Sequence, residues 1–326
     1  MIRIGIVGYG NVGRGAEAAV LQNEDMVLGG IYTRRAPEAV RPLREDTPVL
    51  PVSFLMDKTA DVDVLLLCGG SATDLPRQTP ELARRYCVVD TFDTHARIPE
   101  HFANVDAAAK AGGTAAIIST GWDPGLFSLM RLLGTAVLPE GTGDTFWGPG
   151  VSQGHSDAVR RIKGVADARQ YTIPVQRTVN AVRKGESGFT ARDKHTREVY
   201  VVLEEGADPQ RVAREIITMP HYFDEYDTTV HFISADEMGA EHAAMPHGGF
   251  VIRSGKLGEK RQYDSLMEFK LTLDSNPMFT GAFLAAFGRA CYRLHAQGKT
   301  GCFTAFDVPL GLLSPLDGSA LRSKLL

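Results

Sequence analysis

The chain has 326 residues, of which 44% are hydrophobic and 23% charged, and its formal net charge is −4. This length accommodates two domains, each large enough to bury a core of its own. The charge balance has no basic excess, which argues against a nucleic-acid partner. The longest apolar runs fall far short of the roughly 20 residues that span a bilayer, so we expect no membrane association.

Residues 2–7 already form a strand-like segment, which leaves no room for a signal peptide before the fold begins. Four cysteines show neither CxxC spacing nor a metal-like spacing with histidine: Cys68, Cys87, Cys291 and Cys302. We therefore expect reduced thiols in a cytoplasmic protein and no metal site.

Strand-like and helix-like segments alternate over the first 120 residues. The sequence predicts strands at 2–7, 26–32, 62–68, 87–90 and 115–119, and helices at 12–21, 75–86 and 99–111. The strands are almost continuously apolar, which is typical of a parallel sheet with helices on both faces. The predicted fold class of this part is a doubly wound α/β sheet of the Rossmann type.

The pattern changes after residue 121. Asp123-Pro124 has the composition of a helix start, with Asp as the cap and Pro at the first position, and the helix should run to about Leu138. Strand-like segments with few helices between them follow at 169–175, 198–203, 229–233, 250–253 and 265–273, and a long helix is expected at 277–297. This predicts an α+β second domain with a mostly antiparallel sheet.

The stretch Gly8-Tyr9-Gly10-Asn11-Val12-Gly13 has the form GxGxxG. It follows a predicted strand directly and opens a predicted helix, which is the context that a dinucleotide-binding turn requires. The glycines allow the tight turn, the approach of the backbone to a pyrophosphate and close packing of helix on strand. The start of the helix then faces the negative charge.

The end of the second predicted strand indicates which nucleotide is bound. NAD-binding proteins usually place an acid there to bind the ribose 2′-hydroxyl. This chain has Thr33-Arg34-Arg35 instead, and guanidinium groups suit a 2′-phosphate in a bidentate fork. We therefore predict NADP as the cofactor.

Two further loops follow predicted strands, where ligands bind in doubly wound sheets. One begins with Cys68-Gly69-Gly70-Ser71, whose small residues would allow close approach of a cofactor, and the other is Thr91-Phe92-Asp93. From spacing alone, the first loop is equally well explained as a plain turn with a helix cap at Thr73 or Asp74.

Two carboxylates and a tryptophan follow the last predicted strands of the sheet: Asp93, Trp122 and Asp123. They could converge on a cofactor. Asp93 could equally be only a turn former, and Asp123 only a helix cap. Glycine-rich loops further along the chain carry aromatic and polar residues at 146–150, 153–156, 245–249 and 276–277.

At these residues the chain resembles the meso-diaminopimelate dehydrogenase family over nearly its whole length. The matching stretches are Gly8–Gly13, Ser71–Asp74, Ser119–Gly125, Thr145–Gly150, Ser152–Asp157, Met245–Gly249 and Asn276-Pro277. The runs STGWDPG, TFWGPG, SQGHSDA and MPHGG are far more specific than the dinucleotide turn.

The resemblance implies a reversible, NADP-dependent oxidative deamination at the D-configured carbon of meso-2,6-diaminopimelate. The products are L-2-amino-6-oxopimelate, ammonia and NADPH, and in the cell the aminating direction serves diaminopimelate and lysine biosynthesis. The resemblance also implies a homodimer whose C-terminal segment returns to the nucleotide domain. The predicted domains are therefore 1–121 with 277–326, and 122–276.

The resemblance assigns residues to the site as well. Asp93 and Asp123 would hold the reacting ammonium group, with electrostatic positioning as their main role. The substrate-binding positions are Asp93, Trp122, Asp123, Trp147, Gln153, Gly154, Thr172, Arg197, His247 and Asn276. The cofactor-binding positions are Gly8, Tyr9, Gly10, Asn11, Val12, Gly13, Thr33, Arg34, Arg35, Cys68, Gly69, Gly70, Ser71, Thr91, Phe92, Asp93, Thr120, Gly121, Trp122, Asp123 and Pro124.

The chain departs from the family pattern in a few places. Phe92 stands where some relatives have tyrosine, and Phe250 where histidine is expected. The stretch 176–192 matches poorly, so Arg192 competes with Arg197 for the role of carboxylate clamp at the distal, L-configured end.

Three other functions fit the dinucleotide turn. Two are enzymes, a dihydrodipicolinate reductase and a sugar oxidoreductase, but the Glu-Lys-Pro motif common in the latter is missing from the sequence. The third is a non-catalytic NADP sensor, which would have less need of the acidic pair and the polar loops.

Overall fold

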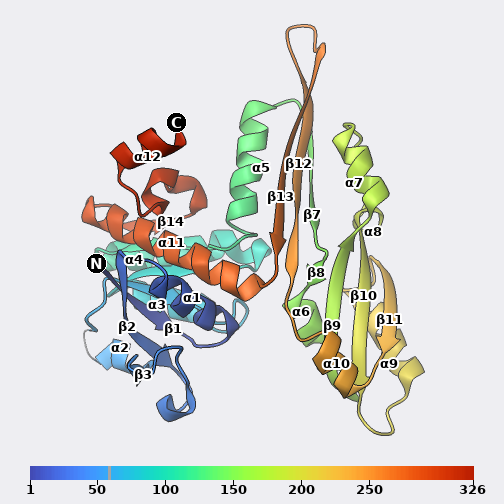
Figure 1. The fold of residues 1–326 in the computed structure, drawn as a ribbon, viewed down its shortest axis with the longest axis horizontal. Helices are drawn as coiled ribbons and strands as arrows, with labels where there is room; N and C mark the ends of the chain where they lie inside the picture. The colour runs from blue at the N-terminus through green and yellow to red at the C-terminus, as the bar shows by residue number, and fades with distance from the viewer. Residues whose placement is uncertain (58–59) are drawn as a thin grey trace. The chain divides into compact units, whose positions relative to one another are not determined.

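The computed structural model describes residues 1–57 and 60–326 (Figure 1). The chain forms two compact units. Unit 1 consists of Met1–Leu129 and Pro277–Leu326, and unit 2 of Met130–Asn276. The boundary predicted between residues 121 and 122 lies inside unit 1, which therefore contains both Trp122 and Asp123.

Unit 1 contains a seven-stranded sheet in the order β14-β6-β5-β4-β1-β2-β3. Its strands are β1 (Ile2–Val7), β2 (Met26–Thr33), β3 (Val49–Pro51), β4 (Val64–Leu67), β5 (Cys87–Asp90), β6 (Ala115–Ile117) and β14 (Gly301–Phe303). Every neighbouring pair is parallel. The Rossmann-type prediction is confirmed, and the C-terminal segment contributes the strand at one edge.

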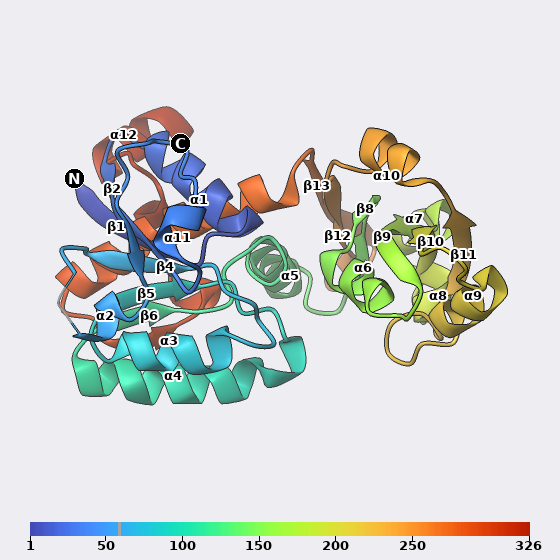
Figure 2. The same ribbon diagram turned by 90° about the horizontal axis from the view of Figure 1, so that it is seen from below.

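Helices cover both faces of this sheet (Figure 2). They are α1 (Asn11–Leu21), α2 (Phe54–Asp57), α3 (Leu75–Ala83), α4 (Ile98–Gly112) and α11 (Asn276–Ala296), with short 3-10 turns at Pro37–Ala39, His95–Arg97, Ala305–Asp307 and Leu310–Leu313. The last helix, α12 (Gly318–Leu325), has no buried residue and does not cover the sheet. The C-cap of α4 is Gly113 in the left-handed region, at φ 66°, in agreement with the predicted glycine stop.

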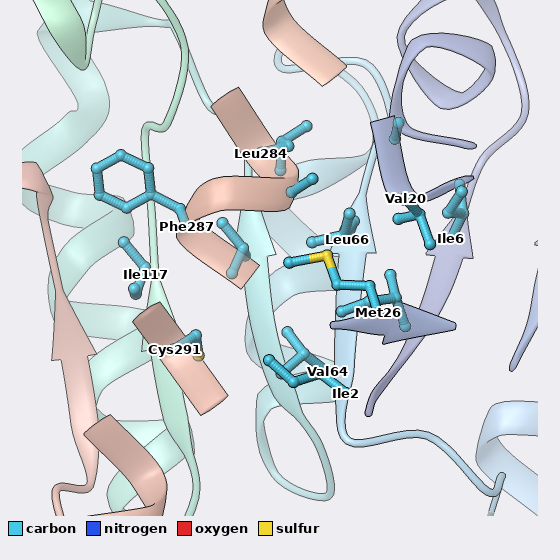
Figure 3. Close-up of a cluster of buried hydrophobic side chains, with 14 of the residues drawn as sticks. Ile2, Ile6, Val20, Met26, Val64, Leu66, Ile117, Leu284, Phe287 and Cys291 are labelled. Atoms are coloured by element: carbon cyan, nitrogen blue, oxygen red, sulfur yellow. The ribbon is translucent and has the colours of Figure 1, made fainter. Parts of the chain in front are cut away.

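Successive residues of β4 enter two different cores. Val64 and Leu66 pack with side chains of α1 and α11, including Leu284 and Phe287 (Figure 3). Leu65 and Leu67 pack on the opposite face, against α3 and α4. Because both faces are covered, the strand is apolar at every position rather than at alternate ones.

The predicted cap at Asp123-Pro124 is wrong. Helix α5 (Leu126–Val137) begins at Leu126, after a turn that contains a cis peptide bond before Pro124. Gly125 has φ 125°, which no helical residue adopts, and the Leu126 N–H donates to Gly121 O at 3.0 Å. Asp123 therefore lies in a closed turn ahead of the helix.

Unit 2 contains two sheets where one was predicted. β11, β10, β9 and β8 form a four-stranded sheet, and β13, β12 and β7 form a three-stranded one. Only the β10–β11 pair is parallel among the paired strands described, so the prediction of mostly antiparallel pairing is confirmed. The bounds are β7 (Thr142–Trp147), β8 (Gly150–Val151), β9 (Val165–Pro174), β10 (His195–Leu203), β11 (Asp227–Phe232), β12 (His247–Leu257) and β13 (Tyr263–Leu273).

The expectation of few helices in this region is also wrong. Short helices lie between the strands: α6 (Gln153–Arg160), α7 (Gln176–Arg183), α8 (Ala191–Lys194), α9 (Pro209–Ile217) and α10 (Ala235–Glu241). Each has four to nine residues, too few turns for a helical period to stand out in the sequence. In the described parts of the chain, no helix has the length and apolarity needed to cross a membrane. All four cysteines are free thiols.

Candidate active site

The glycine turn joins β1 to α1 at the point where the strand order reverses, between β4 and β2. Gly8 has φ 88°, and a Cβ on Gly13 would lie 2.3 Å from Gly8 O, so neither position accepts a side chain. A Cβ on Gly10 would meet no atom within 4 Å, which leaves open space where a pyrophosphate can approach the backbone. The turn therefore fits a dinucleotide.

Tyr9 differs from its neighbours in this turn. Its ring is buried and its hydroxyl donates to Glu17, and burial together with this hydrogen bond raises the pKa of the phenol. Only the main chain of Tyr9 is therefore placed to contact a cofactor. Its carbonyl accepts a hydrogen bond from the Arg35 guanidinium.

The two predicted phosphate-binding arginines lie just beyond β2. Arg34 and Arg35 are exposed, while Thr33 is buried and its Oγ1 accepts from the Arg35 N–H at 3.1 Å. Arg34 pairs with Asp74 at 2.7 Å beside a hollow of about 410 Å³. Asp74 stands at the cap of α3 but makes no cap hydrogen bond, because its carboxylate binds Arg34 and the Gly70 N–H.

A serine joins the two loops that follow β4 and β5. Ser71 Oγ accepts from the Asp93 N–H at 2.8 Å and from the Thr94 N–H at 3.1 Å. Burial raises the pKa of the neighbouring Cys68 thiol to about 12, so this thiol is protonated at neutral pH. The Ser71 contacts join this loop to the loop that carries Asp93, which a plain turn does not require.

Asp93, Trp122 and Asp123 reach the same edge of the sheet as the glycine turn. Asp93 follows β5 and is exposed, whereas Asp123 follows β6, the neighbouring parallel strand, and is half-buried. Trp122 is almost fully buried and packs edge-on against Phe127, with ring centroids 5.2 Å apart. The sheet therefore brings a tryptophan and two acids to the same edge as the dinucleotide turn.

Unit 2 contains a buried cation. Arg197 of β10 is 6% exposed and lies opposite Thr172 of β9. Its guanidinium donates to Thr172 Oγ1 and stacks on the Tyr226 ring at 3.9 Å, but its Nε has no partner in the described chain. Burial of such a charge without a carboxylate is costly, and the guanidinium could bind an anionic ligand.

Two neutral histidines lie in the field of Arg197. His155 and His247 each have a pKa of about 4, lowered first by burial and then by the charge of Arg197. His247 is packed tightly, since a Cβ on Gly150 would lie 2.4 Å from its Cα. At neutral pH these imidazoles add hydrogen-bonding capacity near Arg197 without adding charge.

The remaining predicted substrate residues gather around these groups. Gln153 and Asn276 both contact Met245, through the Gln153 amide to Sδ at 3.1 Å and the Asn276 N–H to O at 3.0 Å. The main-chain N–H of Trp147 donates to His195 Nε2 at 2.9 Å. Gly154 is exposed at the start of α6. The predicted substrate residues of unit 2 other than Gly154 thus lie in β9, β10 and the start of β12 or contact residues there and at Met245.

Arg192, the competing candidate, lies elsewhere. It is exposed and pairs with Asp227 at 2.7 Å. A solvated arginine that already has a carboxylate partner is a poor clamp for a second carboxylate. The geometry supports Arg197.

Sequence reasoning missed three residues that support the site. His195 and Tyr226 contact Trp147 and Arg197 only through the tertiary fold. Asp90 had a weak signal, because it is a charged residue at the end of an otherwise apolar strand. No group of three or more potential metal ligands occurs among residues 1–57 and 60–326.

A doubly wound sheet with a dinucleotide turn, arginines after its second strand and an acidic pair at the same edge defines a pyridine-nucleotide-dependent oxidoreductase. Residues 121–275 match the family model for the diaminopimelic acid dehydrogenase C-terminal domain. The chain is 58% identical to meso-diaminopimelate D-dehydrogenase of Ureibacillus thermosphaericus, with 100% of this chain and 99% of the relative covered. It is 47% identical to that of Corynebacterium glutamicum, with 96% of each covered. The chain belongs to the meso-diaminopimelate D-dehydrogenase family.

Solved structures agree with this membership. The C. glutamicum DAP dehydrogenase in complex with DAP has a TM-score of 0.92 at 46% identity, covering 100% of this chain and 99% of that one. An engineered D-amino acid dehydrogenase bound to NADP⁺ has a TM-score of 0.88 at 44% identity, with the same coverage. The reductase, sugar-oxidoreductase and sensor alternatives are thereby set aside.

Proposed function

We propose that this chain catalyses the reversible, NADP-dependent oxidative deamination of meso-2,6-diaminopimelate at its D-configured carbon. The observation that carries the proposal is the buried Arg197, a cation that lacks a carboxylate partner within the described residues, in a chain of this family. The products are L-2-amino-6-oxopimelate, ammonia and NADPH, and the aminating direction serves diaminopimelate and lysine biosynthesis.

NADP⁺, when bound, accepts the hydride from the D-configured carbon. The chain supplies the rest. The glycine turn and Arg34 and Arg35 bind the phosphates, and Asp93 and Asp123 attract the ammonium group of the reacting centre. Loss of the hydride and a proton leaves an imine, which water hydrolyses to the keto group and ammonia.

The distal end of the substrate determines which centre reacts. Arg197 and Thr172 bind the carboxylate at the L-configured end, and His247 and Asn276 complete its hydrogen bonds. Because the substrate has two chemically equal ends of opposite configuration, fixing one end selects the other for oxidation.

Formation of NADPH, followed by its absorbance with the meso, LL and simple D-amino acid substrates, tests this function. We expect turnover with the meso form and none with the LL form. Tight NADPH binding without turnover of any amino acid would retain the Rossmann assignment and remove the dehydrogenase.

The protein also acts as a cytoplasmic homodimer in this proposal. Support for the dimer comes from apolar side chains that α5 and β13 leave exposed, such as Leu132 at 46%, Leu133 at 49% and Leu266 at 49%. Light scattering should give twice the 35.4 kDa chain mass. A monomer that has full activity would contradict the dimer.

A further inference from the structure

Asp90 has an environment unlike that of Asp93 and Asp123. It is the last residue of β5 and has no exposed surface. Four donors converge on its carboxylate. The Phe92 N–H and the Ser119 N–H reach Oδ1 at 3.0 and 2.9 Å. The Thr79 hydroxyl and the His101 Nε2–H reach Oδ2 at 2.8 and 2.7 Å.

The two sides of this carboxylate serve different parts of unit 1. Oδ2 binds side chains of α3 and α4, which hold the carboxylate in place. Oδ1 binds main-chain groups of the two loops after β5 and β6. The Asp90 carbonyl adds two bonds to the second loop, from the Thr120 N–H at 2.9 Å and the Thr120 hydroxyl at 2.7 Å.

The residues held by Oδ1 lie next to the acidic pair. Phe92 directly precedes Asp93, and its ring stacks on His101 with centroids 4.1 Å apart. Ser119 begins the turn that carries Asp123, and it adopts φ 58°, a conformation that is strained for serine and needs support. Asp90 thus fixes one main-chain point in each of the loops that carry Asp93 and Asp123.

We propose that Asp90 is a positioning residue, whose buried carboxylate sets the separation and orientation of Asp93 and Asp123 without touching the substrate. The proposal rests on the proposed function. It requires an acceptor at Oδ1 and not a negative charge. Asparagine meets that requirement, since its oxygen can accept from Phe92 and Ser119 while its amide donates to the Thr79 hydroxyl and to His101 Nε2 in the tautomer that accepts there.

Asp90→Ala and Asp90→Asn separate the two requirements. Alanine leaves the Phe92 and Ser119 N–H groups without an acceptor, and kcat should fall about 100-fold, as a small displacement of a reacting group does. NADPH affinity should fall much less than kcat, because Asp90 makes no hydrogen bond to the glycine turn or to 33–35 among described residues and contacts the predicted cofactor-binding set only through Phe92 and Thr120. Asparagine should restore most of the wild-type kcat.

Asp106→Ala is the matched control. The Asp106 carboxylate also accepts a main-chain N–H in unit 1, from Cys302 at 3.0 Å, but it serves the edge strand β14. The substitution Asp106→Ala should lower the melting temperature and leave kcat unchanged. Equal kcat losses in D90A and D106A, at equal folded fraction, would show that Asp90 has only a structural role and would overturn the proposal.

Hydrogen exchange of the Phe92 and Ser119 amides gives a readout that does not depend on activity. Protection should be lost in D90A and kept in D90N. If D90A fails to fold, D90N decides alone: a loss of about 100-fold in kcat with both amides protected would mean that charge matters, against the proposal. A wild-type enzyme inactive on the meso substrate would refute the proposed function, whereas unprotected amides in wild type would refute the Asp90 geometry.

Discussion

Arg197 has the least solvated charge in unit 2, and its removal should affect one substrate class selectively. Arg197→Met keeps an unbranched apolar stem and removes the guanidinium. A charge-assisted hydrogen bond contributes about 1.5–3 kcal/mol, so KM for meso-diaminopimelate should rise roughly 10- to 150-fold. KM for a short D-amino acid, which has no distal carboxylate, should not change.

Arg192→Met is the control for this experiment, because Arg192 pairs with Asp227 at the surface. It should leave both KM values unchanged. An equal rise in KM for the long and the short substrate in Arg197→Met would contradict the distal-clamp role.

Removal of Arg34 or Arg35 should weaken the binding of NADP and not that of NAD. Arg35→Ala removes a guanidinium expected at the 2′-phosphate, and Kd for NADP should increase about 10- to 150-fold on the same energetic scale, with Kd for NAD nearly unchanged. Titration of intrinsic fluorescence measures both constants. Arg44→Ala, at an exposed pair with Asp46, is the control. Equal losses for both nucleotides would mean that Arg35 does not read the phosphate.

The residues predicted from the sequence are those with a local signal. The glycine turn, Arg34 and Arg35 follow a strand at fixed spacing, and the resemblance supplied the positions in unit 2. Tyr226 and His195 could not be predicted. The Tyr226 ring over the Arg197 guanidinium, and His195 as acceptor for the main-chain N–H of Trp147, arise only when distant segments meet.

Helices α1 and α11 pack backbone against backbone, and two glycines allow it. A Cβ on Gly281 would lie 2.2 Å from Gly15 C, and one on Gly15 would lie 2.3 Å from Pro277 O. Gly281→Ala forces the helices apart, and overpacking of this kind costs about 1–3 kcal/mol of unfolding free energy. Denaturant titration should show this loss.

Gly239→Ala is the matched control. Gly239 lies in α10, and a Cβ there would meet no atom within 4 Å. The same substitution should therefore be neutral, or stabilise by up to about 1 kcal/mol because alanine favours helix. A stable Gly281→Ala protein would show that the two helices can separate at no cost.

The elements predicted correctly are those whose residues are apolar either continuously, as in buried strands, or at helical spacing. The core strands of unit 1, including the short β6, and the long helix α11 show their burial in apolar sequence. The missed strands are either only two or three residues long, as β3, β8 and β14 are, or mostly polar, as β7 is. The start of α5 failed for a different reason: Asp-Pro has the composition of a helix cap, but Gly125 and the turn around it delay the helix to Leu126.

The stability of the whole molecule should depend on pH through three histidines, of which His195 and His247 are buried and His155 is half-buried. His155 and His247 have a pKa of about 4 and His195 of about 3, against about 6.5 in an unfolded chain. Between these values the unfolded chain binds protons that the folded chain does not, so the unfolding free energy falls as pH falls from about 6.5 towards 4. Each histidine contributes up to about 1.4 kcal/mol per pH unit in that window.

Urea titrations at about pH 7 and about pH 5 measure this slope, both values being chosen around the ordinary histidine pKa. His195→Gln should flatten it, while His221→Gln, at an exposed position, should leave it unchanged. If His195→Gln left the pH dependence of the unfolding free energy unchanged, the conclusion that His195 is buried as a neutral imidazole would be wrong.

Unit 1 is completed by the C-terminal end of the chain, since β14 pairs with β6 and α11 covers one face of the sheet through Leu284 and Phe287. During synthesis on the ribosome, residues 1–129 emerge first and must wait for all of unit 2 before residues 277–303 arrive. Until then the nascent sheet lacks an edge strand and part of its cover. A message truncated near codon 276 would therefore yield a chain with an exposed apolar face, recognisable to chaperones and proteases, rather than a smaller nucleotide-binding protein.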